Sequence, residues 1–208
     1  MNADLSDDYI NLIIVISIAS MTVGNIMALK QNNVKRMLAF SGISHAGFML
    51  MTLLNISNSA GNLLYYTAAY SLSGIAAFAV ILYVCKNKDN EDIANFNGLG
   101  KNNPLMAAVL TASLLSMAGI PIFAGFFAKM FLFTQTIEAG YLVVVIAAVI
   151  NSIISVGYYF KLILAMYNKE PNEEATKTPF VFYAVAIVSI LLNIVLGLFP
   201  SAVLDLLG

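Results

Sequence analysis

Six long apolar runs, separated by short polar connections, constrain the fold of this chain more than any other feature. Each run is long enough to cross the hydrocarbon core of a bilayer, which takes a helix of about 20 residues. Helices are expected because backbone exposed to lipid must satisfy its own hydrogen bonds, which an open sheet cannot do. The sequence therefore predicts an all-α polytopic membrane protein with six transmembrane helices, at about residues 9–29, 34–54, 63–85, 104–135, 141–167 and 179–198.

The composition favours a single membrane domain over residues 1–208. Hydrophobic residues make up 60% of the chain and charged residues 10%, whereas a soluble domain has about 45–50% and about 25%. The six spans leave no room for a separate soluble domain, so the lipid bilayer is the expected surrounding. A net charge of −1 provides no basic surface, so no nucleic acid is expected as a partner.

Lysine and arginine residues lie in alternate connections, which indicates how the chain is oriented. Short cytoplasmic loops accumulate these two residue types, and the second and fourth connections, residues 55–62 and 136–140, contain neither. The first, third and fifth connections are therefore expected in the cytoplasm and both termini on the outer side. Those three connections carry Lys30, Lys35 and Arg36, then Lys86, Lys88 and Lys101, then Lys169 and Lys177.

The fourth span is too long for one straight helix across a membrane. Its 32 residues would make a helix of about 48 Å, against a hydrocarbon core of about 30 Å. Pro121 removes a backbone donor and clashes with the preceding turn, while Gly119 and Gly125 allow the chain to bend. We therefore expect a discontinuous helix, broken near residues 119–125.

Lys129 follows this break and is the only charged residue between Pro104 and Gln135. A lysine at the centre of a membrane helix costs about 2.5–3.5 kcal/mol on insertion scales, and ionisable residues retained there commonly serve in proton relays. Two other interpretations remain open. The side chain could extend to the outer interface, or the helix could be kinked with no transport pathway.

Two further ionisable residues are candidates for proton transfer. His45, the only histidine, lies nine residues after Arg36 and so about 13 Å into its helix; it could pass protons along a water chain. It could equally be a histidine bonded between helices that meet at the small residues Gly42 and Ala46. Lys161 lies close to the cytoplasmic end of the fifth span, where an extended, interfacial lysine is favoured, with a role as a cytoplasmic-side relay as the alternative.

Other chemistry is not indicated by the sequence. One histidine and one cysteine, Cys85, give no cluster for a metal or an iron–sulfur centre. The glycines form neither a dinucleotide-binding nor a phosphate-binding pattern. We therefore expect no cofactor and no electron carrier in this chain.

Seven ordered motifs closely resemble the antiporter-like membrane subunits of respiratory complex I, the NADH:quinone oxidoreductase. They cover almost the whole chain, and their length makes the resemblance specific. They are MTVGN at 21–25, NVKRMLAFS at 33–41, ISHAG at 43–47, FNGL at 96–99, AGIP at 118–121, AGFFAK at 124–129 and YYFK at 158–161.

The resemblance implies a fold and a set of site residues. The family has fourteen helices that contain two inverted five-helix repeats, each with a discontinuous helix. This chain resembles the last six helices, which are the second repeat and a closing helix. Lys129 falls on the lysine that the family uses as a protonatable site, and Tyr70 falls where related subunits tend to have histidine, so Tyr70 is expected to line the water path. Nothing matches the first repeat, so we expect a fragment or a split gene product.

The resemblance also implies a function. The chain is expected to be a subunit of a proton-translocating NADH:quinone oxidoreductase in a bacterial inner membrane, with other membrane subunits of complex I as partners. NADH, flavin, iron–sulfur clusters and quinone would belong to other subunits. A subunit of a multi-subunit cation/proton antiporter is the alternative, and a structural fragment without transport is a third interpretation.

Overall fold

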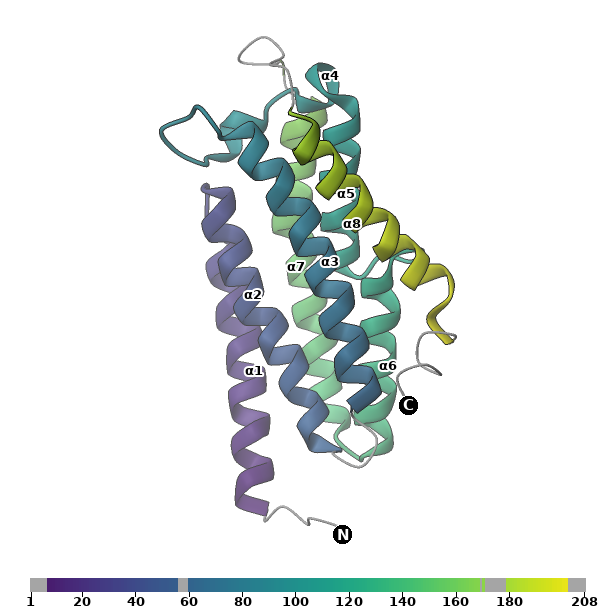
Figure 1. The fold of residues 1–208 in the computed structure, drawn as a ribbon. Helices are drawn as coiled ribbons and strands as arrows, with labels where there is room; N and C mark the ends of the chain where they lie inside the picture. Colours follow the sequence, from purple (N-terminus) through teal and green to yellow (C-terminus); the bar gives the residue numbers. More distant parts are fainter. Residues whose placement is uncertain (1–6, 56–59, 169, 171–178, 202–208) are drawn as a thin grey trace.

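The computed structural model describes residues 7–55, 60–168, 170 and 179–201, and every regular element in these residues is helical. Within these residues, eight α-helices and two short 3-10 helices follow one another (Figure 1). They are α1 (Asp7–Leu29), α2 (Val34–Leu50), η1 (Met51–Leu54), α3 (Ala60–Val84), η3 (Ile93–Phe96), α4 (Leu99–Asn102), α5 (Pro104–Ala118), α6 (Ala124–Glu138), α7 (Leu142–Asn168) and α8 (Phe180–Leu198).

The predicted all-α membrane fold is confirmed. Five helical segments of the described chain are long and apolar enough to cross a membrane: α1, α2 with η1, α3, α7 and α8. The predicted fourth span is the pair α5 and α6, separated by residues 119–123. The number of α-helices exceeds the six predicted spans because this span is two helices and because the one-turn helix α4 precedes it.

Asparagine side chains define where two of the spans begin. Asn33 accepts a hydrogen bond from the Arg36 amide at 3.0 Å at the start of α2. Asn103 does the same for the Met106 amide at 3.3 Å at the start of α5, where Pro104 occupies the first turn. These side chains satisfy amide groups that have no partner within the helix, so both boundaries are determined locally.

The helices form a bundle in which α3 lies between α2 and α8 (Figure 1). The helix α1 packs along α2 and α7, and α3 packs against α5, α6 and α8. Glycines allow α1 and α2 to approach closely: a Cβ at Gly24 would lie 2.7 Å from the Ser44 amide, and one at Gly47 would lie 2.8 Å from the Met21 amide. Small residues in such contacts allow backbones of membrane helices to pack directly.

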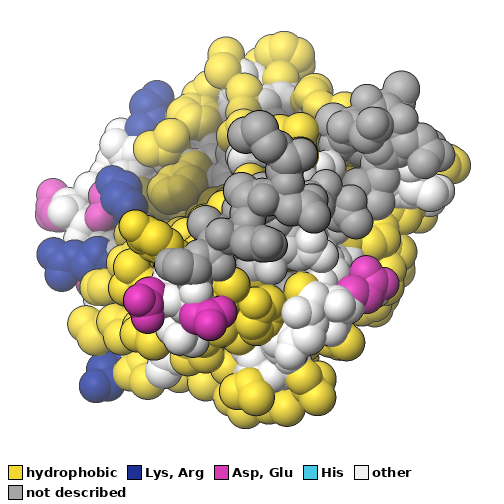
Figure 2. Space-filling model, turned by 90° about the horizontal axis from the view of Figure 1, so that it is seen from below, with side chains coloured by type: hydrophobic (Ala, Val, Ile, Leu, Met, Phe, Trp, Pro, Cys, Tyr) yellow, Lys and Arg dark blue, Asp and Glu magenta, His cyan; other side chains and the backbone are white. Residues whose placement is uncertain are grey.

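Charged side chains other than Lys129 lie at the two ends of the bundle in the described residues, and not on its apolar sides. Figure 2 shows the bundle from the end where α1 begins, with hydrophobic side chains over much of the rim and acidic side chains near the end. The opposite end, which we call the lysine-rich end, holds every described cation except Lys129. These cations are Lys30, Lys35, Arg36, Lys86, Lys88, Lys101 and Lys161.

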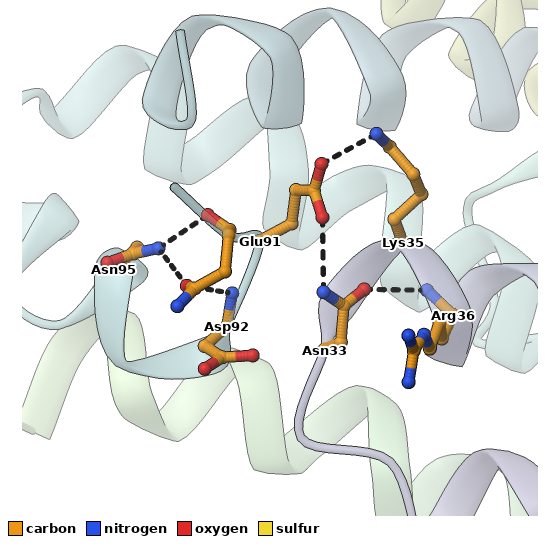
Figure 3. A network of polar contacts seen from close by, with 7 residues as sticks. Asn33, Lys35, Arg36, Glu91, Asp92 and Asn95 are labelled. Atoms are coloured by element: carbon orange, nitrogen blue, oxygen red, sulfur yellow. Dashed lines mark hydrogen bonds and ion pairs between the residues drawn. The ribbon is translucent and has the colours of Figure 1, made fainter. Parts of the chain in front are cut away.

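Polar contacts at the lysine-rich end join two connections that are far apart in sequence (Figure 3). The Glu91 carboxylate pairs with Lys35 at 2.7 Å and accepts a bond from Asn33 Nδ2 at 3.1 Å. The backbone continues the contact, because the Val34 amide donates to the Glu91 carbonyl at 2.7 Å and the Ile93 amide to the Asn32 carbonyl at 2.8 Å. The α3–α4 connection is therefore attached to the start of α2.

Candidate functional site

The break in the fourth span is formed by residues 119–123. Gly119 ends α5 in a left-handed conformation, with φ of 86°, and its amide donates to the Leu115 carbonyl at 3.1 Å. Ile122 has φ of 88°, a conformation that is strained for a β-branched residue. Such strain persists only where surrounding structure holds it, and it is concentrated at functional sites. Pro121 lies inside this segment, between the two half-helices, as the sequence predicts.

Gly125, the third residue predicted at the break, lies within the first turn of α6. A Cβ there would lie 2.7 Å from the carbonyl carbon of Ser116 and closer still to the carbonyl oxygen. Its missing side chain therefore permits the start of α6 to pack directly against the last turns of α5. The two half-helices touch, although the backbone between them is irregular.

Lys129, on α6, is buried at the level of this break, with 5% of its surface exposed. Its Nζ donates to the carbonyl of Ala118 at 3.0 Å and to Ser152 Oγ at 2.7 Å, and it lies 5.1 Å from the centre of the Phe48 ring. Ala118 is the last residue of α5, so its carbonyl lies at the negative end of that helix and is freed from helical bonding by the break. The ammonium is thus bound by a helix end.

No carboxylate partners Lys129 within the residues that the structure describes. The described acidic residues lie at the two ends of the bundle: Asp7, Asp8 and Glu138 at one, and Asp89, Glu91, Asp92 and Glu170 at the other. The described ion pairs, Lys35 with Glu91 and Lys101 with Glu170, are both at the lysine-rich end. In the same residues, no three His, Cys, Asp or Glu side chains are grouped to hold a metal ion. Lys129 is therefore held by neutral groups.

A small cavity of about 10 Å³ adjoins Lys129, which is room for about one water molecule. It lies between α2, α3, α5 and α6, and its polar lining comes from side chains on all four helices. The lining residues are His45, Tyr66, Ala69, Tyr70, Ser73, Ser116, Met117, Gly125, Ala128 and Lys129. The cavity brings together three residues that the sequence singles out, since Lys129, His45 and Tyr70 all line it.

His45 is buried in α2, and both of its ring nitrogens are hydrogen-bonded. Nδ1 bonds with the Tyr66 hydroxyl at 2.8 Å and Nε2 with the Tyr159 hydroxyl at 3.3 Å. Tyr159 in turn bonds with Ser41, one turn along α2 toward the lysine-rich end. Tyr70 stacks on the imidazole, with ring centroids 4.4 Å apart. His45 thus connects the cavity to a chain of hydroxyl groups, and it also joins three helices.

Lys161 lies outside this cavity. It is exposed on α7, and its Nζ donates to the Gln31 carbonyl at 3.1 Å and to Asn32 Oδ1 at 2.9 Å, in the α1–α2 connection. Its position agrees with the favoured expectation of an interfacial lysine at the lysine-rich end. Its alternative role as a relay stays a prediction, without a described contact to the buried site.

Two buried residues that contact the break were not identified from the sequence. Ser116 on α5 accepts a hydrogen bond from the Gly125 amide at 3.3 Å, across the break. Asn193 on α8 is fully buried, and its Oδ1 accepts a bond from the Ser116 hydroxyl at 3.0 Å. A single amide in a very apolar span is the signal that could have drawn attention to Asn193, because burying an amide without partners is costly.

The chain is similar to known proteins in sequence and in fold. Residues 1–155 match the family model described as NADH:quinone oxidoreductase/Mrp antiporter, transmembrane. The chain is 78% identical over 207 residues to NADH-quinone oxidoreductase subunit N of Flavobacterium johnsoniae, covering 100% of this chain and 45% of that protein.

Solved structures share the fold. A chain of respiratory complex I from Thermus thermophilus superposes with a TM-score of 0.85 at 32% identity, covering 94% of this chain and 45% of that one. A chain of the Mrp complex from Dietzia has a TM-score of 0.86 at 23% identity over 95% of this chain and 46% of that one, which is similarity of fold alone. The chain spans about half the length of the relatives that it matches. It is a multi-pass membrane protein, and it belongs to the NADH:quinone oxidoreductase/Mrp antiporter transmembrane family.

Proposed function

We propose that this chain forms part of a membrane subunit of a proton-translocating NADH:quinone oxidoreductase and that Lys129 is the residue that takes up and releases the proton. The observation that carries the proposal is the buried Lys129 ammonium, held by the Ala118 carbonyl and Ser152 with no described carboxylate partner. A buried lysine with neutral partners can lose its proton without leaving an unpaired carboxylate in the membrane. The relatives named NADH-quinone oxidoreductase subunit N support the same proposal.

The cavity supports a route for the proton on one side of Lys129. A water molecule in it would lie between Lys129 and His45, and hydroxyl groups continue from His45 through Tyr159 to Ser41. Hydroxyl and imidazole groups can both donate and accept a proton, so this order of groups is suited to proton transfer. We further propose that electron transfer among NADH, flavin, iron–sulfur clusters and quinone takes place in other subunits, with which this chain would assemble. Those subunits would alter the charge around Lys129 and so change its proton affinity.

The proposal is tested by Lys129→Ala in the assembled complex, with protons moved per NADH oxidised measured in inside-out vesicles. Loss of most proton translocation is expected, whereas full pumping would rule out the assignment. Lys101→Ala is the matched control, because Lys101 is an exposed lysine whose ammonium pairs with Glu170 at the surface. It should leave the proton-to-NADH ratio at the wild-type value.

A subunit of a multi-subunit cation/proton antiporter is the second candidate, since the matched family model includes Mrp antiporters. Vesicles that contain the assembled protein distinguish the two functions. Proton movement that depends on NADH and quinone and needs no sodium supports the oxidoreductase, and sodium-for-proton exchange in the absence of NADH supports the antiporter.

We also propose that the lysine-rich end faces the cytoplasm of a bacterial plasma membrane, with both termini outside, because cytoplasmic loops accumulate lysine and arginine. Labelling of a cysteine introduced at exposed Lys86 tests this orientation: impermeant maleimide should react in inside-out vesicles and not in intact cells. The native Cys85 should interfere little, because burial raises the pKa of its thiol to about 11 and the thiolate is the reactive form.

A further inference from the structure

Asn193 is a fully buried amide in α8, the most apolar of the described spans. Its Nδ2 donates to the Ala69 carbonyl and to Ser73 Oγ, both at 3.0 Å, and its Oδ1 accepts from Ser116 Oγ at 3.0 Å. Both amide protons and the oxygen are therefore used, and the side chain joins α8 to α3 and α5. An amide buried in so apolar a helix needs such partners, because leaving its polar atoms unpaired would be costly.

The Ser116 hydroxyl completes the first turn of α6 from the other side of the break. Phe123, the residue before α6, offers no side-chain hydrogen bond to cap the helix. The Gly125 amide, which has no partner inside α6, donates instead to Ser116 Oγ at 3.3 Å. A serine hydroxyl has one proton, and Asn193 accepts it. Asn193 thereby keeps a lone pair of Ser116 directed toward Gly125.

One turn further along α8, Gly197 packs directly against the broken segment. A Cβ at Gly197 would lie 2.7 Å from the carbonyl carbon of Phe123 and 2.8 Å from the Ala124 amide, and closer still to the Ile122 carbonyl oxygen. Ile122 is the residue with the strained backbone. The face of α8 that carries Asn193 and Gly197 therefore covers the break and holds it in this conformation.

This contact sets the geometry around Lys129. Gly125 and Lys129 lie one turn apart on α6, and Ser116 and Ala118 lie two residues apart on α5. The Ser116–Gly125 bond therefore fixes how far the Lys129 ammonium lies from the Ala118 carbonyl. We propose that Asn193 is a positioning residue for proton transfer: through Ser116 it fixes the separation of the two half-helices and so the hydrogen bonding of Lys129. This inference rests on the proposed role of Lys129.

The test uses Asn193→Leu, Ser116→Ala and the double variant in the assembled complex in vesicles. The protons moved per NADH oxidised should fall at least twofold in each single variant, and the pH of half-maximal pumping should shift by half a unit or more. The double variant should be no worse than the more affected single variant, because both changes remove the same hydrogen bond. Independent, multiplied effects would overturn the inference.

Tyr65→Phe is the matched control. It removes another hydrogen bond that holds α8 to α3, from the Tyr65 hydroxyl to the Leu196 carbonyl at 2.8 Å, and it leaves the bonds from Asn193 to Ser116 and from Ser116 to Gly125 in place. Its pumping ratio and pH profile should match the wild type, and an effect equal to that of Asn193→Leu would mean that only general packing of α8 matters.

The inference and the proposed function can fail separately. Wild-type pumping by Lys129→Ala would overturn both. Loss of pumping by Lys129→Ala, together with a wild-type ratio and pH profile in Asn193→Leu, would overturn the inference alone. If the Asn193→Leu complex does not accumulate, Ser116→Ala, which acts on the other partner of the same bond, decides the question by the same two measurements.

Discussion

Replacing Gly125 with alanine tests whether the two half-helices need direct backbone contact. The new Cβ would lie 2.7 Å from the carbonyl carbon of Ser116, where ordinary contact begins at 3.4 Å, and closer still to the oxygen. Both sides of the contact are backbone and cannot rotate away, so the half-helices would have to separate by roughly 1 Å. The bond from Lys129 Nζ to the Ala118 carbonyl, now 3.0 Å, would then lengthen unless the lysine side chain changed its conformation.

The cost in stability follows from the same contact. Overpacking costs about 1–3 kcal/mol, and the upper end applies where backbone must move. Alanine recovers up to about 1 kcal/mol of helix propensity relative to glycine. The free energy of unfolding should therefore fall by about 2 kcal/mol, which is roughly a thirtyfold change in the folding equilibrium constant.

Unfolding of the full-length subunit in mixed micelles of increasing SDS content, followed by circular dichroism, measures this loss. Gly74→Ala is the matched control, because Gly74 lies in α3 with nothing within 4 Å of an added Cβ. That variant should be unchanged or more stable by up to about 1 kcal/mol. If Gly125→Ala proves as stable as Gly74→Ala, the half-helices are not in the direct contact described.

Two further predictions concern a buried polar contact between α1 and α7 and an ion pair at the lysine-rich end. Asn25→Leu should lower the free energy of unfolding by about 1–2 kcal/mol, because Asn25 donates to Asn151 and accepts from Tyr158 between α1 and α7. The same micelle titration measures this loss, and an unchanged unfolding midpoint would contradict the prediction. Hydrogen bonds from Lys35, which has the larger effect, and from Asn33 lower the pKa of the Glu91 carboxyl. The Glu91 carboxylate therefore stabilises the folded connection above its unfolded-state pKa, and this stabilisation is lost as pH falls through its folded-state pKa. Hydrogen-exchange protection in residues 86–95, corrected for the pH dependence of intrinsic exchange, should therefore fall in acid in the wild type and much less so in Glu91→Gln, and an equal fall in both would refute this.

The sequence specifies the spans and the position of the break because both depend on local chemistry. Apolar runs predict membrane helices whatever their neighbours, and the six predicted ranges agree with the described helices to within a few residues. Pro121 and Gly119 act within their own chain segment, so their effect on the helix can be read from the sequence. For Lys129 the sequence specifies the position after the break, and only the structure shows that its side chain is buried rather than extended to the outer interface.

The residues that hold the site in place act through tertiary contacts, which a single sequence does not display. Ser116 and Asn193 are 77 residues apart and meet only when α8 packs over the break. Ile122 gives no local sign of its left-handed backbone, since a β-branched residue avoids that conformation by itself. Gly125 was expected to let the chain bend, whereas it lies in regular helix and permits a close contact.

Lys129→Arg tests most directly whether Lys129 changes its protonation state. Arginine keeps the positive charge and can reach the same carbonyl, but it is not deprotonated in proteins. If Lys129 must release its proton, the assembled Lys129→Arg complex should move far fewer protons per NADH oxidised than the wild type. A wild-type ratio would show that a fixed charge at this position suffices, which would contradict the role assigned to Lys129.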